Sequence, residues 1–576
     1  MNPQQREFIL QNRKKMSSRQ IAKSLGISRS DVEGFLKERT IEPAPAPPGG
    51  RSAAVLPWFW IFFFGGIVLR AIYVFSLRST PFFAPLSNKL DDGVYDSMAQ
   101  AISQGNWLAD LPFSAYRIPL YPYFLGVIYK FFGRDLLAVH VLQSLIGAFT
   151  PLLVYGVLDL AFQKKRTALI GAGIAAFYIP FVFYENLLLG ETLSIFLNLL
   201  GVWLVLRSLD DAPQRTPLVT LFLAGVVLGA SALVRPNVIV GLVFTVAFIF
   251  YVFFKARKSA GTALSAALVF IFAIALALAP NVWRNYRLHK DFVPLSAVGG
   301  INLYIGNNPE ADGKFRLVKG IGTSLDEMLA NSEAIASEKI GRSLKPSEAS
   351  SYWSREALHY AVSSPGDFIR LIARKKFYFL NHYEFPDILN LYFTARFISI
   401  LSLGFYQYGL VVVLGLYGLV AAWKRRNAAY FFLGGFLAAY AASVVLFFIT
   451  ARYRLPAVPF FIAFAAVGAD EIWSARERRD GKALMKAAAV IMLASFLVFR
   501  PVEKVNFATN YNSLAIAMKN RGDARQAEEY YKKAIETDPG YPSPYYNLAL
   551  LLHEQGRDDE AAAFQQKYQE ATAVLG

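Results

Sequence analysis

The sequence predicts a mainly α-helical protein that crosses a membrane about eleven times, with one soluble segment before the first span and another after the last. Three observations support this prediction. Of 576 residues, 55% are hydrophobic and only 18% are charged, which is more apolar surface than one soluble core can bury. Runs of about 20 apolar residues, long enough to cross a bilayer, recur along the chain. The short links between these runs are rich in lysine and arginine.

The apolar runs define a membrane domain over residues 55–500. They lie at 55–77, 137–161, 167–184, 190–208, 217–233, 236–254, 262–280, 401–423, 429–449, 455–473 and 484–500. The segment 118–132 is also apolar, and we expect it not to cross but to lie at the membrane surface or as a re-entrant helix. The sequence has no cysteine, so neither a disulfide nor a thiolate metal site indicates the compartment.

The formal charge of +17 is concentrated in links between spans, which favours membrane topology over nucleic acid as its cause. Clusters of this kind stay on the cytoplasmic side of a membrane. We therefore expect the N-terminus to be cytoplasmic and, with an odd number of spans, the C-terminus to lie outside, as in a multi-pass protein of a bacterial inner membrane. The link residues are Lys164, Lys165, Arg166, Lys255, Arg257, Lys258, Lys424, Arg425, Arg426, Arg476, Arg478 and Arg479.

Residues 1–40 form a basic soluble segment in which 17–32 resembles a helix-turn-helix. Ala22 would let two helices approach, Gly26 would form the turn, and Val32 would pack the second helix. The pattern indicates this shape more than it indicates DNA, so a DNA reader and a protein-binding module both remain open. The proline-rich residues 41–54 are expected to act as a semi-rigid linker.

Two longer links would lie outside, at 79–135 and 281–398. In the second, the glycines and asparagines of 299–309 predict a compact loop that uses positive φ angles, and the remainder has a helical pattern. A cluster of Lys375, Lys376, Asn381, His382, Glu384 and Asp387 could position a lipid head group, but a solvated amphipathic helix explains it nearly as well.

After the last span, residues 508–541 and 542–575 repeat with the period of tetratricopeptide units. Small residues at fixed places let paired helices nest, and aromatic residues fill the space between them. Two units are few for independent stability, so we expect the module at 508–575 to dock on something, including a protein partner. The matching pairs are Leu514 with Leu548, Ala515 with Ala549, Gly522 with Gly556, Ala527 with Ala561, and Tyr530 with Phe564.

An acidic pair follows the first span, and basic, proline-containing elements follow in order. This order resembles the GT-C membrane glycosyltransferases that use polyprenyl-phosphate sugars, in the protein mannosyltransferase-like branch of family 39 type. The segment 91–95 is similar to the Asp-Glu-x-x-Tyr element of that branch, with Asp92 in place of Glu. Residues 117–120 are similar to its Lys-Pro-Pro-Leu element, with Arg117 for Lys and Ile118 for the first Pro. The segments 184–191, 235–237 and 452–456 resemble its acidic second outer loop and two later basic elements.

The resemblance implies an inverting transfer in which Asp91, or else Asp92, accepts the proton of the acceptor. Fixed guanidinium groups would hold the departing phosphate. The phosphate candidates are Arg117, Arg452, Arg454 and, less strongly, Arg235; the candidates for binding sugar or acceptor are Glu191, Tyr95 and Glu185.

Each of these residues has a structural alternative. Asp91, Asp92 and Glu191 could cap helices, and the arginines at 452 and 454 could anchor a span at the interface. The few histidines show no zinc spacing and no metal site is predicted, although a divalent cation shared by Asp91 and Asp92 remains open.

The leading hypothesis is transfer of a sugar from a polyprenyl-phosphate carrier, in the lipid bilayer, to an acceptor on the outer face. The appended repeats favour a protein acceptor, while a lipid or a glycan remains open. A transporter or flippase is the alternative, but most of the singled-out charges lie at span ends rather than mid-span. A signalling receptor would leave many spans and the acidic outer loop without a role.

Overall fold

The computed structural model describes residues 55–573 apart from short gaps, together with part of the N-terminal segment. The gaps are 88–89, 113, 213–215, 317, 319, 323–324, 424–426 and 503–505, and the N-terminal residues described are 5, 9, 18–28 and 30–32. The chain divides into two compact units, Met1–Pro57 and Trp58–Gly576. The expected linker at 41–54 and the basic residues at 424–426 lie outside the described residues.

Helix α2 and the glycine after it are described in the part of the first unit where a helix-turn-helix is expected. Helix α2 spans Ser18–Leu25 and is followed by Gly26, whose φ of +65° is a conformation that glycine adopts without strain. Ala22 and Val32 are buried together with Ile9 and Ile21. The helix-turn-helix itself stays a prediction, because the described residues include only one of its helices with defined bounds.

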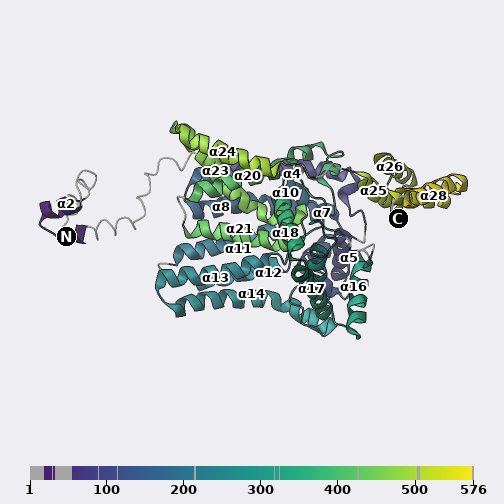
Figure 1. Cartoon of the computed structure of the whole chain (residues 1–576), viewed down its shortest axis with the longest axis horizontal. Coiled ribbons are helices and arrows are strands. Elements are labelled where there is room, and N and C mark those ends of the chain that lie inside the picture. Colours follow the sequence, from purple (N-terminus) through teal and green to yellow (C-terminus); the bar gives the residue numbers. More distant parts are fainter. Residues whose placement is uncertain are drawn as a thin grey trace. The chain divides into compact units, whose positions relative to one another are not determined.

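Nine helices among the described residues are long and apolar enough to cross a membrane (Figure 1). A tenth candidate is the pair α9 (Lys165–Ala176) and α10 (Ile179–Glu185), bent by 50°, and α12 (Leu218–Ala232) is a shorter apolar helix. Every predicted span thus corresponds to a helix or a helix pair. The nine are α4 (Val55–Arg78), α7 with α8 (Leu136–Ala148 and Thr150–Phe162), α11 (Glu191–Asp211), α13 (Val238–Arg257), α14 (Ala260–His289), η3 with α20 (Ser399–Gly404 and Gln407–Ala422), α21 (Ala428–Leu446), α22 with η5 and α23 (Ala451–Arg454, Leu455–Ala457 and Val458–Glu477) and α24 (Gly481–Val498).

Small residues bring the spans α20 and α23 into backbone contact. A Cβ at Gly418 would collide with the carbonyl oxygen of Phe464, and one at Gly468 would lie 2.7 Å from the carbonyl oxygen of Leu414. Because lipid gives helices no hydrophobic reason to associate, close packing of this kind supplies much of the attraction between spans.

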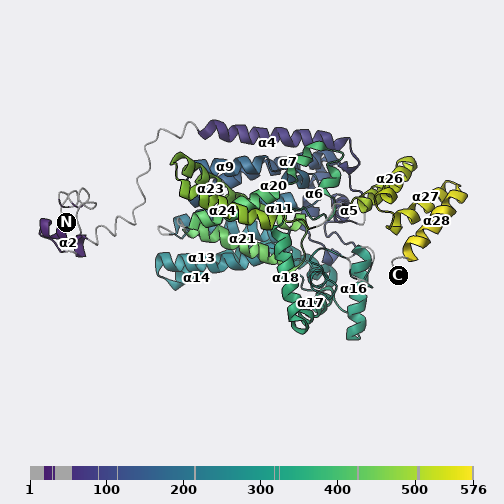
Figure 2. The ribbon, with the colours of Figure 1, turned by 45° about the horizontal axis from the view of Figure 1, so that its top comes forward.

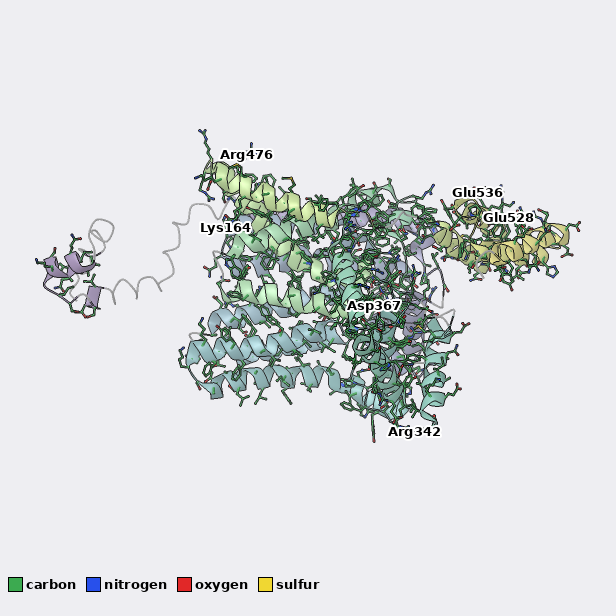
Figure 3. The ribbon with its side chains drawn as sticks, in the orientation of Figure 1. Lys164, Arg342, Asp367, Arg476, Glu528 and Glu536 are labelled. Carbon is green, nitrogen blue, oxygen red and sulfur yellow. The ribbon has the colours of Figure 1, made fainter. Side chains whose placement is uncertain are left out.

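Basic links lie at one end of the bundle and the large polar regions at the other. Figure 3 shows Lys164 and Arg476 at one end and Arg342 and Asp367 at the opposite end. At the first end, buried Asp470 pairs with Lys164 and Arg166, which ties α23 to the start of α9. This separation is the one that the charge pattern predicts.

The first polar region contains η1 (Pro81–Phe83), α5 (Asp91–Ser103), η2 (Ser114–Tyr116) and α6 (Leu120–Phe132). Helix α6 has 13 residues and is not among the span candidates, and that 118–132 does not cross stays a prediction. The second region contains α15 (Gly299–Gly306), α16 (Leu325–Ile340), α17 (Pro346–Ser363), α18 (Pro365–Leu380) and α19 (Leu391–Thr394).

The expected compact loop at 299–309 is wrong over most of its length, because 299–306 form helix α15. Two of its glycines, Gly300 and Gly306, serve close approach rather than positive φ. A Cβ on Gly300 would collide with the Ser350 carbonyl, and one on Gly306 with the Phe447 carbonyl. These contacts bring α15 against α17 and against the C-terminal end of α21.

The C-terminal helices form two antiparallel pairs, α25 (Ala508–Asn520) with α26 (Ala524–Thr537) and α27 (Pro542–Glu554) with α28 (Asp558–Ala573), which Figure 2 shows in succession. The repeat positions Leu514 and Leu548 are fully buried. Gly522 and Gly556 have φ angles of +85° and +73° in the turns. The two-unit repeat predicted for 508–575 is therefore a pair of helical hairpins.

We expect Gly418→Ala to lower the thermal transition of the detergent-solubilised protein, because the new methyl group separates α20 from α23. Overpacking of this kind costs about 1–3 kcal/mol. Gly434→Ala, in span α21, is the matched control because its Cβ would meet atoms only at 3.8 Å or beyond. An equal loss in both variants would show that the backbone contact contributes nothing particular.

Candidate functional site

A cavity of about 410 Å³ lies where the two polar regions meet the ends of the spans. Three arginines and two aspartates face it, so its charged lining is basic by one unit when all five are ionised. The lining residues are Leu90, Asp91, Tyr95, Tyr116, Arg117, Ile118, Arg235, Val298, Asn302, Phe315, Leu329, Pro386, Asp387, Ile388, Phe448, Arg452 and Tyr453.

Asp91 is the first residue of α5 and is held by two guanidinium groups. Its Oδ2 lies 2.6 Å from Nη2 of Arg452, and its Oδ1 lies 3.5 Å from Nη1 of Arg117. Burial favours the neutral acid, but the two arginines outweigh it and hold the pKa of Asp91 below its ordinary value. The carboxylate is therefore ionised near neutral pH. The amide groups at the helix start favour the same charge.

Arg452 also binds a second carboxylate of the cavity. Its Nε lies 2.6 Å from Oδ2 of Asp387, while burial raises the pKa of Asp387 against the opposing effect of Arg452. The Nη1 of Arg452 is buried without a hydrogen-bond partner among the described residues. The guanidinium thus joins two acids and keeps one donor group available.

A second ion pair, between Glu191 and Arg235, lies next to Arg452. Glu191, the first residue of α11, is fully buried and pairs with Arg235, and the same Oε1 lies 3.9 Å from Nε of Arg452. The guanidinium groups of Arg235 and Arg452 lie over the ring of Tyr453, at 5.0 and 5.2 Å from its centroid. Glu191 is not a helix cap, since Gly190 occupies that position.

Asp92 is not among the residues that line the cavity, although it is adjacent in sequence to Asp91. Its Oδ1 accepts a hydrogen bond from the backbone N–H of Gly93 at 2.9 Å. Burial, with the negative charge of Asp91 adding to it, raises the pKa of Asp92 to about 7. Neither aspartate caps α5, because the N-cap is Leu90, which makes no side-chain capping bond.

Tyr95 lies one turn after Asp91 and forms part of the same wall. Its ring packs edge-on against that of Tyr121, with centroids 5.5 Å apart. Residues four apart share a helix face, which places the aromatic ring beside the carboxylate.

Two other candidates from the sequence lie outside the cavity lining. Arg454 is fully buried, pairs with Glu384 at 3.2 Å, donates to the carbonyl oxygen of Asn381 at 2.7 Å and lies 3.8 Å from the ring centroid of Tyr408. Glu185 forms a buried ion pair with Arg70 of α4, with Oε2 2.7 Å from Nε. Both make internal ion pairs that fasten neighbouring elements together.

The most important residue that the sequence left outside the catalytic set is Asp387. It belonged to a cluster that a solvated helix could also explain, and the structure contradicts that alternative for Lys375, which is fully buried and donates to Asn307. In the sequence, Asp387 was marked only by its place in that cluster, next to Pro386. Its partner Arg452 is distant in the chain.

The acidic pair is not arranged to share a divalent cation. Both oxygens of Asp91 face guanidinium groups, and the Asp92 carboxylate turns to the backbone of its own helix. Within the described ranges, no group of three or more His, Asp or Glu side chains could hold a metal.

Comparisons with known proteins agree with this organisation. Residues 114–283 match the family of dolichyl-phosphate-mannose-protein mannosyltransferases, and residues 508–541 and 530–563 match tetratricopeptide repeats. An uncharacterized protein of Methanocaldococcus jannaschii is 39% identical over 59 residues, which are 10% of this chain and 69% of that protein.

Two solved structures of low sequence identity are also similar. The oligosaccharyltransferase of Archaeoglobus fulgidus, in complex with Zn and sulfate, has a TM-score of 0.39 and 15% identity over 83% of this chain, which spans 57% of that protein's length. ArnT of Cupriavidus metallidurans, bound to undecaprenyl phosphate, has a TM-score of 0.29 and 13% identity over 75% of this chain and 80% of its own.

The raised pKa of Asp92 leads to a prediction about stability. The folded protein keeps a proton on Asp92 up to about pH 7, whereas the unfolded chain releases it near 3.8. Folding stability through this group therefore falls as pH rises across that interval. We expect Asp92→Asn to have a higher thermal transition than the wild type above pH 7, with a difference that shrinks as the pH is lowered towards 4.

Asp91→Asn is the matched control, and its effect should have the opposite sign. Its charge is stabilised by two arginines, so at neutral pH its removal should lower the transition. A stability difference for Asp92→Asn that does not vary with pH would contradict this account of its environment.

Proposed function

We propose that this chain transfers a sugar from a polyprenyl-phosphate carrier to an acceptor, as a GT-C membrane glycosyltransferase. The match of residues 114–283 to the family of dolichyl-phosphate-mannose-protein mannosyltransferases supports this proposal. The observation that carries the proposal is the pairing of Asp91 with Arg117 and Arg452 inside one cavity. A carboxylate to take a proton and guanidinium groups to hold a phosphate are the two needs of such a transfer.

In the proposed reaction, Asp91 accepts the proton of an acceptor hydroxyl as the hydroxyl oxygen attacks the anomeric carbon. The new glycosidic bond forms as the bond between that carbon and the phosphate oxygen breaks. The bonding electrons leave with the polyprenyl phosphate, and the anomeric configuration inverts. One carboxylate suffices for this direct displacement.

Arg117 and Arg452 are the proposed phosphate ligands, with Arg235 supporting them. Guanidinium groups remain ionised and offer paired N–H donors that match phosphate oxygens. The buried Nη1 of Arg452, which lacks a hydrogen-bond partner among the described residues, is a donor for this purpose.

The two roles are connected because the same guanidinium groups pair with Asp91. A donor phosphate bound to Arg117 and Arg452 would compete with Asp91 for them. Release from these arginines removes the influence that lowers the pKa of Asp91, so the carboxylate becomes a better base once the donor is present. Donor binding would in this way prepare the catalytic group.

The remaining groups are proposed to position these residues. Asp387 orients Arg452 through its Nε, and Glu191 orients Arg235 rather than binding sugar. Tyr95 offers an aromatic wall beside Asp91 for the sugar or acceptor. Arg454 and Glu185, which lie outside the lining, are assigned no part in the transfer.

We propose a single sugar on one phosphate as the donor. A protein is the proposed acceptor, because tetratricopeptide units commonly present peptide-binding surfaces. The separation of basic links from the cavity favours a cavity on the outer face of a bacterial inner membrane and a cytoplasmic N-terminus. A transporter is less favoured because the charged lining gathers at one end of the bundle.

The test is a transfer assay with purified protein in lipid, a panel of radiolabelled polyprenyl-phosphate sugars and membrane extract, following label into protein, lipid and glycan fractions. We expect label to move with the wild type. Asp91→Asn should slow transfer by on the order of 10²–10⁴-fold, the usual contribution of a positioned proton acceptor.

Asp92→Asn provides the matched control, since it removes the neighbouring carboxylate, which is not part of the cavity lining. It should retain transfer. If transfer survived in Asp91→Asn and was lost in Asp92→Asn, the proton acceptor would be Asp92. A wild-type rate that falls to half of its maximum as the pH is lowered to about 7 would indicate the same residue, because the pKa of Asp92 is about 7. No consumption of any donor would contradict the transferase assignment.

A further inference from the structure

The first tetratricopeptide repeat contacts two chain segments that adjoin Asp91 and Asp387, the acids of the cavity. Asp91 follows the segment that contains η1, and Asp387 precedes the segment that contains α19. Both segments reach helix α25 or the residues that flank it.

An aromatic cluster joins the three parts. Phe393 of α19 is 1% exposed, and its ring meets that of Tyr511 on α25 edge-on, with centroids 4.9 Å apart. The same ring lies 6.0 Å from Phe82 of η1 and 5.5 Å from Phe507, just before α25. Aromatic pairs at these separations contribute beyond the area they bury.

Polar contacts follow the same path. The side-chain amide of Asn390 donates to Oδ1 of Asn510 at 3.4 Å, and the guanidinium of Arg396 lies over the rings of Phe507 and Tyr511 at 5.6 and 5.8 Å. On the other segment, Arg521 at the end of α25 donates to the carbonyl oxygens of Ala84 and Pro85 at 3.4 Å.

The second repeat is connected differently. The second repeat makes polar contacts with the first repeat, through Asn547 with Asn512, Glu554 with Lys519 and Arg557 with Glu528. Figure 2 shows α27 and α28 beyond α26, at the end of the module. The two repeats therefore offer a natural comparison.

We propose that the first repeat is a positioning element of the transferase and not only an adaptor for a partner. By holding the segments around Phe82 and Phe393 together, it keeps Asp91 and Asp387 on either side of Arg452. This inference rests on the proposed function for its catalytic consequence, while its structural part stands on the contacts alone. Tyr511 contacts both Phe393 and Arg396 of the segment that follows Asp387.

The experiment compares Tyr511→Ala with Tyr545→Ala in the full-length protein. The two tyrosines occupy the same place in successive repeats and are equally buried, at 8% and 7% exposure, but Tyr545 bonds within the module, to the carbonyl of Pro539. We expect Tyr511→Ala alone to speed hydrogen–deuterium exchange in the peptides covering 80–95 and 384–398. It should also lower kcat by on the order of tenfold with little change in the donor KM, within the roughly 10²-fold that a displacement of 1 Å can cost.

Tyr511→Phe should restore both readouts, because it keeps the ring. Arg396→Gln, at an exposed position, should give a smaller change in exchange and in kcat. It replaces Tyr511→Ala in the comparison if that variant does not fold. Equal exchange in the Tyr511 and Tyr545 variants would overturn the proposal. A wild type without transfer would count against the proposed function only, since the exchange comparison would still decide whether the first repeat holds these segments.

Discussion

The Arg452 guanidinium is shared by Asp91 and Asp387, which come from distant parts of the chain. A buried charge is costly unless it is paired, so each of the three groups requires the other two to be in place. Removing one partner of a buried ion pair typically costs about 3–5 kcal/mol. This requirement fixes the start of α5, the loop after α18 and the start of α22 relative to one another.

Other parts of the molecule position the contact of Arg452 with Asp91 and Asp387. Spans α11, α13 and α21 bring Glu191, Arg235 and the residues before Arg452 to one end of the bundle. Glycine contacts such as that of Gly306 with Phe447 let the second polar region close over the cavity. The tetratricopeptide module contacts the segments next to the two aspartates, at Ala84 and Pro85 before Asp91 and at Phe393 after Asp387.

Much of this arrangement could be predicted from the sequence because composition and residue order carry it. The length of the apolar runs located the spans, the 34-residue period located the repeats, and both form helices. The resemblance selected five residues that line one cavity: Asp91, Tyr95, Arg117, Arg235 and Arg452.

Side-chain direction could not be predicted in the same way. Arg452 and Arg454 lie two residues apart on one short helix, and residues at that spacing do not share a face, so one enters the cavity while the other pairs with Glu384. Asp91 and Asp92 separate for a similar reason. Glu185 and Asp387 depended on partners far away in the chain, Arg70 and Arg452, which local patterns do not identify.

In the proposed reaction, donor phosphate and Asp91 compete for the same guanidinium groups. The most direct measurement is the affinity of the purified protein for a polyprenyl phosphate, compared between the wild type, Asp91→Asn and Arg452→Gln. We expect tighter binding by Asp91→Asn, on the order of tenfold or about 1.4 kcal/mol, because the competing charge is gone, and weaker binding by Arg452→Gln. Unchanged or weaker binding by Asp91→Asn would contradict it.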